Sequence, residues 1–67
     1  MPDILVQPEI DDENRLMGWI GFLFCEESRG WLGVTQLEVT PGLASNAALS
    51  YWYSDCWNRS LNRLSQD

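Results

Sequence analysis

An apolar run at positions 15–25, RLMGWIGFLFC, constrains the fold more than any other part of the sequence. Its aromatic and branched residues predict a β-strand. Successive side chains of a strand point to opposite faces of a sheet, and here both alternating sets are apolar. An antiparallel sheet with one face in water shows apolar and polar residues in alternation instead. Both faces of this strand therefore need cover, and one helix can cover only one of them.

Two shorter segments complete the predicted sheet. Residues 4–7 form a β-prone run between two prolines, which is typical of an edge strand because proline donates no hydrogen bond to a ladder. Residues 26–30 have the length and the glycine of a hairpin connection, so residues 31–39 are predicted to return as an antiparallel strand. We interpret the glycines of the predicted strands as positions where another element approaches the backbone closely. These glycines are Gly18, Gly21, Gly30 and Gly33.

The C-terminal part predicts one helix over about residues 44–65. Thr40 before Pro41 is a possible start, with Ser45 as the alternative cap. One side of the helical wheel gathers Leu49, Trp52, Tyr53, Cys56, Trp57, Ser60 and Leu64. Tyr51 falls off that side and is expected to contact a partner, because tyrosine is enriched in binding hot spots. The predicted fold class is α+β, a single compact domain over residues 1–67: a two- or three-stranded antiparallel sheet with one C-terminal α-helix packed on one face.

The second face of the predicted sheet has three candidate covers. The first is the N-terminal segment over residues 4–10 together with the curvature of the strands. The second is another copy of the chain, and the third is a different protein. Monomeric proteins rarely leave a large apolar patch bare. The choice decides whether the chain is a monomer, a homodimer or a subunit of a larger complex, and the sequence leaves all three open.

Charge and length exclude several classes of function. The 67 residues carry ten Asp and Glu against four Arg, with no Lys and no His, for a formal charge of -6. Direct binding of nucleic acid or anionic lipid depends on basic groups, so neither is expected. The longest apolar run is about half a membrane span, and no signal peptide is visible at the N-terminus. We therefore expect a cytoplasmic protein, in the host-cell cytoplasm if the chain is phage-encoded.

No residue pattern predicts catalysis, a metal or a cofactor. Without histidine there is no Ser-His or Cys-His pair. Cys25 and Cys56 lack the CxxC spacing and a neighbouring base, and two cysteines alone do not make a closed zinc site. The glycines do not match a phosphate-binding loop. The sequence predicts a protein that is not an enzyme and that works by binding.

The acidic residues are the remaining functional signal. They carry all of the net charge in the first half of the chain, and the candidate partner-binding set is Glu9, Asp11, Asp12, Glu13, Glu26, Glu27 and Glu38, with Tyr51 as an anchor. One interpretation is that they only keep a small Trp-rich domain in solution. The other is that carboxylates fixed by a rigid sheet imitate a row of phosphates and occupy a basic groove on a protein or nucleoprotein complex. Arg15 and Arg29 flank the acidic clusters and are expected to hold the loops in place.

In size, acidity and absence of catalytic residues, the whole chain resembles small phage-encoded anti-CRISPR proteins. The resemblance rests on no motif, so it transfers no residue role. It implies an inhibitor that blocks nucleic-acid binding by an RNA-guided effector complex through an acidic surface. The alternative is a structural or assembly protein: an obligate homodimer, or a small subunit that buries the apolar second face of its sheet.

Overall fold

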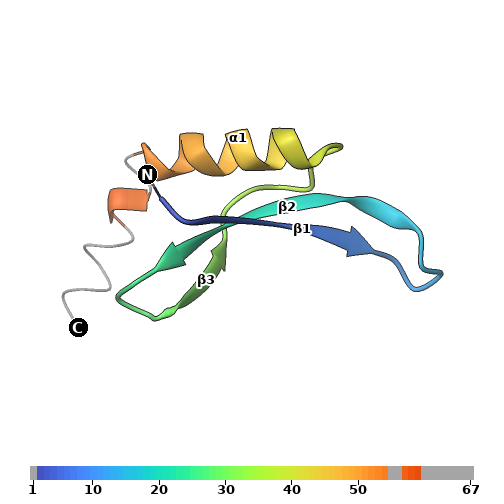
Figure 1. The fold of residues 1–67 in the computed structure, drawn as a ribbon, viewed down its shortest axis with the longest axis horizontal. Helices are drawn as coiled ribbons and strands as arrows, with labels where there is room; N and C mark the ends of the chain where they lie inside the picture. Colours follow the sequence, from blue (N-terminus) through green and yellow to red (C-terminus); the bar gives the residue numbers. More distant parts are fainter. Residues whose placement is uncertain (1, 55–56, 60–67) are drawn as a thin grey trace.

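A computed structural model describes residues 2–54 and 57–59, and it confirms the α+β class. Three strands, β1 (Ile4–Ile10), β2 (Leu16–Cys25) and β3 (Gly30–Gly33), are followed by the helix α1 (Pro41–Trp52). The helix lies along one side of the sheet (Figure 1). The molecule is elongated, with principal extents of 42 × 21 × 17 Å, because the long strand β2 runs along its whole axis.

The strands form one antiparallel sheet in the order β1-β2-β3. β1 extends to Ile10, beyond the predicted segment 4–7, because Pro8 lies on an edge strand where its missing N–H costs no ladder bond. The prediction of a strand over 31–39 is wrong beyond Gly33. There the Thr35 hydroxyl, in place of a backbone carbonyl, accepts a hydrogen bond from the Gly21 N–H at 2.8 Å. Regular pairing therefore stops, and only an isolated bridge between Trp19 and Glu38 follows.

The helix begins at Pro41 rather than at about residue 44, which confirms Thr40 before Pro41 as its start. The Thr40 hydroxyl accepts a hydrogen bond from the Leu43 N–H at 3.1 Å, and Pro41 occupies the first turn, where a missing N–H costs nothing. Ser45 is therefore not the cap.

The helix also ends earlier than predicted, at Trp52. The Ser54 hydroxyl donates to the Tyr51 carbonyl and accepts from the Trp57 N–H at 3.3 Å, so it caps a new turn over residues 57–59. The rest of the predicted helix, at 55–56 and 60–65, lies outside the described residues.

Two aromatic side chains lie on the other side of the helix from the one predicted. Tyr51 is expected off the apolar side, yet it packs against the buried cluster, with its ring 6.1 Å from that of Trp57. Tyr53 is expected on the apolar side and is 68% exposed. The period of α1 accounts for both, because Tyr51 continues the i, i+4, i+7 row of the buried Ala44 and Ala48, and Tyr53 lies opposite that row.

The core lies between α1 and one face of β2. Leu23 and Cys25 are buried there with Ala48, and Ala44 is buried over Gly21. Small residues let the two layers approach so closely that a Cβ built on Gly21 would lie 2.6 Å from the Ala44 carbonyl oxygen. At Gly18, where φ is +158°, a Cβ would lie 2.6 Å from the Glu38 carbonyl oxygen. Close approach is thus confirmed at these two glycines.

Candidate protein-binding surface

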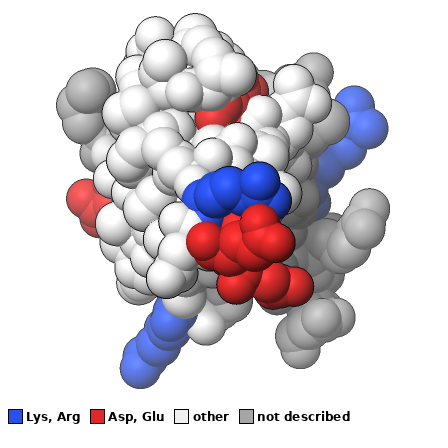
Figure 2. All heavy atoms as spheres, turned by 90° about the vertical axis from the view of Figure 1, so that its right-hand side faces the viewer, with Lys and Arg blue, Asp and Glu red and all other residues white. Residues whose placement is uncertain are grey.

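The β1–β2 hairpin extends beyond the N-terminal end of α1 and forms a protruding tip (Figure 1). We define the hairpin tip as residues 9–17. It holds four of the predicted carboxylates and one guanidinium, which sum to a formal charge of -3, half that of the chain. Figure 2 looks at this end and shows acidic and basic atoms gathered side by side on it.

The turn within the tip is a three-residue hairpin loop, residues 12–14. The Asp11 N–H donates to the Arg15 carbonyl at 3.0 Å, and the Asn14 N–H donates to the Asp11 carbonyl at 3.1 Å. Asn14 has a φ of 64° and so takes the left-handed conformation that such a loop needs at its last position. Asparagine tolerates that conformation better than most residues, because its short polar side chain bonds locally. The loop chemistry therefore fixes the direction in which the tip points.

Asp11 holds this loop together from inside. Its carboxylate accepts from the backbone N–H groups of Glu13 and Arg15, both at 2.9 Å, and from the Arg15 Nε at 3.1 Å. The hydrogen bond from the Arg15 backbone is the main cause that lowers the pKa of Asp11 below its ordinary value, against a smaller opposing effect of burial. Asp11 thus holds the loop in its conformation.

Arg15 also holds the loop in place, as expected. Its Nη2 lies 2.8 Å from the Glu13 carboxylate, while its Nε pairs with Asp11. Asp12 is exposed and forms no ion pair or side-chain hydrogen bond with the described part of the chain. Of the three adjacent acidic residues in the loop, Asp12 is therefore the one that can pair with a partner at no cost to the turn.

Large apolar side chains stand directly behind the acidic loop. Ile10, Leu16 and Met17 are 55%, 58% and 56% exposed, although they belong to the strands. The register shifts here: Ile10 pairs with Leu16 and Glu9 with Gly18, which leaves Met17 as the extra residue of a bulge. The helix does not reach this part of the hairpin. The tip therefore combines exposed apolar surface with negative charge.

The other predicted carboxylates lie elsewhere, so the seven do not form one row. Glu26 and Glu27 belong to the β2–β3 turn at the opposite end of β2, about 30 Å away at roughly 3.3 Å per residue. Glu38 lies beside the middle of β2, bonded through its backbone to Trp19. Arg29 forms no ion pair with the described residues, so its expected role in holding the second loop is not seen there.

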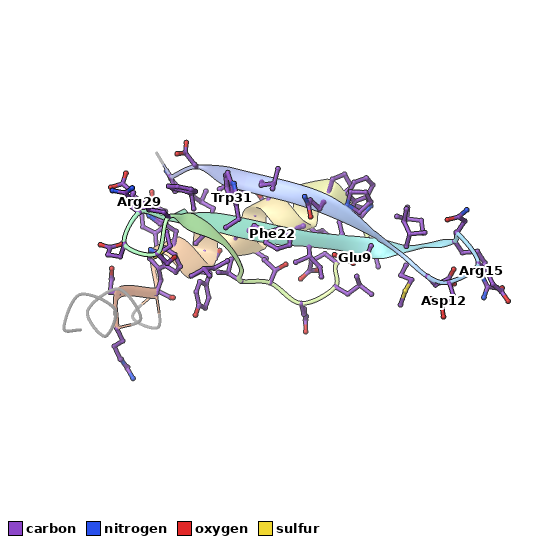
Figure 3. The ribbon with its side chains drawn as sticks, turned by 90° about the horizontal axis from the view of Figure 1, so that it is seen from below. Glu9, Asp12, Arg15, Phe22, Arg29 and Trp31 are labelled. Carbon is purple, nitrogen blue, oxygen red and sulfur yellow. The ribbon has the colours of Figure 1, made fainter. Side chains whose placement is uncertain are left out.

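The face of β2 away from the helix is the second candidate surface. We call it the open face and define it by Ile20, Phe22, Phe24 and Trp31. Figure 3 looks onto it, with Phe22 and Trp31 between Arg29 at one end and Asp12 at the other. The Phe24 and Trp31 rings meet edge to face at 5.4 Å, and Trp31 is 44% exposed.

No element of the described chain packs on this face (Figures 1 and 3). β1 lies beside β2 within the sheet, so the N-terminal segment does not cover it.

Sequence reasoning missed the exposure of Leu16 and Met17, because it treated residues 15–25 as buried throughout. The sequence carries no signal for it, because the part of β2 that α1 covers depends on the three-dimensional path of residues 34–40. The prediction for Tyr51 as an interface anchor also loses its basis, since the residue is half-buried against the core.

Comparison with protein-family models, curated proteins and solved structures found no match to this chain. Within residues 2–54 and 57–59, no helix is long and apolar enough to cross a membrane. No three His, Cys, Asp or Glu side chains in that same part of the chain are placed to hold a metal ion.

Proposed function

We propose that this chain is an acidic inhibitor that inserts its hairpin tip into a basic nucleic-acid-binding surface of another protein. The observation that carries the proposal is the pairing of an acidic loop with three large apolar side chains, each more than half exposed, on a hairpin that protrudes past the helix. Inhibition follows because the tip occupies the surface that nucleic acid would contact. The resemblance to anti-CRISPR proteins makes an RNA-guided effector complex the first target class to test.

The two parts of the tip have different tasks in this proposal. Full burial of a large apolar side chain contributes about 1.5–3 kcal/mol, so covering the exposed halves of Ile10, Leu16 and Met17 is worth roughly 3 kcal/mol in all. Exposed carboxylates add less to affinity, but they speed association with a basic partner and exclude acidic ones. The apolar residues therefore anchor the tip, and Asp12 with its acidic neighbours directs it.

The geometry favours a single inserted tip over a copied row of phosphates. A continuous row needs the carboxylates along one surface, whereas Glu26 and Glu27 lie at the far end of β2. Within the tip, Asp11 and Glu13 are already engaged by Arg15. To block nucleic-acid binding by occupying the surface, the tip only has to fit into the basic groove of the partner.

The test compares matched variants at two tip positions. Asp12→Asn removes the charge, whereas Asp12→Glu keeps it; Met17→Ser removes the apolar anchor, whereas Met17→Leu keeps it. Basic proteins captured from nuclease-treated lysate with the wild-type chain are purified, and their affinity for each variant and for nucleic acid is measured. We expect Asp12→Asn and Met17→Ser to weaken binding and to restore nucleic-acid binding, while the two conservative variants behave like the wild type.

Equal capture by all four variants, each folded, would refute the proposal. So would a captured partner that binds nucleic acid equally well in the presence of the wild-type chain.

The open face supports a second candidate function, assembly as a homodimer or as a subunit. Its specific support is the exposed aromatic pair Phe24 and Trp31 on a face that no described element covers. Trp31→Ser tests it, because the side chain points away from the core. Static light scattering over a range of concentrations then distinguishes the cases: a dimer that Trp31→Ser dissociates supports assembly, and a monomer at every concentration rules out the homodimer.

A further inference from the structure

We infer that a hollow at the opposite end of the molecule from the hairpin tip binds the guanidinium group of an arginine side chain. The hollow lies where β1 begins and β2 ends, next to the C-terminal end of α1, and it encloses about 280 Å³. This inference rests on the proposed function in one respect, since it takes the arginine to belong to the basic partner.

The walls of the hollow combine aromatic rings with carboxylates. Trp52 and Trp57 line it from the helical side together with the acidic residues Asp3, Glu26 and Glu27, and Pro2 and Phe24 complete the lining. No described Lys or Arg lines it. Aromatic faces attract cations, tryptophan most strongly. A hollow lined by three acidic residues and two tryptophans is complementary to an organic cation and repels an anion.

Core packing keeps these walls in place. Trp57 is buried and packs on the cluster around Leu23 and Cys25, and its ring meets that of Tyr51. The Cys25 thiol donates to the Glu27 carboxylate at 3.6 Å, which holds that side chain against the end of β2. The Phe24 N–H bonds the Asp3 carbonyl at 3.4 Å and so ties β1 to the rim. Trp57, Glu27 and the backbone at Asp3 are therefore held in place before a ligand arrives.

The size and the charge pattern favour arginine over other cations. A volume of about 280 Å³ lies at the lower limit of small-molecule pockets, which suits one side chain rather than a larger ligand. The described carboxylates do not converge closely enough to hold a metal ion. A guanidinium group is planar, stacks on aromatic rings and forms two parallel hydrogen bonds to a carboxylate. An ammonium group is a compact and strongly hydrated charge. Arginine therefore matches both kinds of wall.

The test uses the purified full chain and a small probe, with no partner present. N-acetyl-arginine amide is titrated while the indole N–H signals are followed by two-dimensional NMR. N-acetyl-citrulline amide is the neutral probe of the same shape, and N-acetyl-lysine amide is the ammonium probe. We expect saturable shifts of the Trp52 and Trp57 indoles with the arginine probe, weaker shifts with the lysine probe, and none with the citrulline probe. The Trp19 indole, on another part of β2, should not move.

Two variants locate the binding. Glu26→Gln should weaken the arginine probe about two- to fivefold, the effect typical of one exposed charge pair. Trp52→Leu should weaken it by a similar factor through loss of the cation–π contact. Asp12→Asn removes the same charge at the hairpin tip and should change nothing, provided that all three spectra are those of a folded chain.

Equal shifts with the citrulline probe would overturn the inference, and so would an unchanged affinity in Glu26→Gln. A loss in Asp12→Asn as large as that in Glu26→Gln would also overturn it, because the probe would then be sensing net charge alone. If the arginine probe does not bind, the proposed function is not affected, because the proposed function is tested by how tip variants bind the partner. Conversely, tip variants that bind normally would not alter the behaviour of the probe.

Discussion

Gly21→Ala tests the close contact between the helix and the sheet on which the whole scaffold depends. The added Cβ would lie 2.6 Å from the Ala44 carbonyl oxygen and 3.0 Å from the Ala48 Cβ. Ordinary contact begins at 3.4 Å, so α1 must move away from β2 by about 0.8 Å. Neither neighbour is the end of a flexible side chain, and the displacement must be taken up by the helix as a whole.

Overpacking of this kind costs about 1–3 kcal/mol. In a domain of this length each kcal/mol lowers Tm by about 4–8 °C, so we expect a fall of roughly 5–20 °C. The matched control is Gly42→Ala, because a Cβ at Gly42 meets nothing within 4 Å. Alanine there reduces the freedom of the unfolded chain and should stabilise the fold by about 0.4–1 kcal/mol.

Thermal unfolding followed by circular dichroism measures both variants against the wild type. The reasoning predicts that the two substitutions act in opposite directions, although each adds one methyl group to a glycine. A Gly21→Ala variant whose Tm equals that of the wild type would show that α1 does not approach β2 as closely as described.

Three further outcomes follow from the described contacts. Thr40→Ala should destabilise the fold by about 1 kcal/mol in urea unfolding, because the hydroxyl caps α1 through Leu43; no change would mean that the cap is unimportant. The folded-state pKa of Asp11 lies below the ordinary 3.8, so its stabilising effect is complete above that pH and is lost as pH falls through the folded value. The stability gap between the wild type and Asp11→Asn should therefore close in acid, and a gap that widens would contradict the assignment. Partner affinity should fall as salt rises and the screening length shortens, less steeply for Asp12→Asn; equal slopes would remove Asp12 from the interface.

Much of the sheet was predictable because strand patterning is local. The aromatic run that became β2 was placed within one residue at its start, and the hairpin connection before β3 was also correct. β3 was predicted too long because a side chain, the Thr35 hydroxyl, substitutes for a backbone partner. Such a replacement depends on three-dimensional contact and has no periodic signature. The end of α1 at Trp52 was missed for the same reason, since the Ser54 hydroxyl caps a new turn.

The candidate site was predictable in part. An acidic loop between the first two strands was expected, and the clamp by Arg15 follows from its place beside the loop. The different roles of the acidic residues in the loop were not predictable, because sequence alone does not show that Asp11 turns inward while Asp12 points out. Nor does it show that the two acidic turns lie at opposite ends of one long strand. That arrangement depends on the antiparallel register, and it prevents the two acidic turns from forming one continuous row.

The central claim is that the hairpin tip, and not the open face, contacts the partner. Methyl cross-saturation in the complex tests it most directly, because saturation passes from the partner only to methyl groups that lie against it. We expect intensity loss at Ile10, Leu16 and Met17. Ile20 and Leu5, which pairs with Phe22 and so lies on the open face, should be unaffected. Loss at Leu5 and Ile20 with an unchanged tip would contradict it and would assign the interface to the open face.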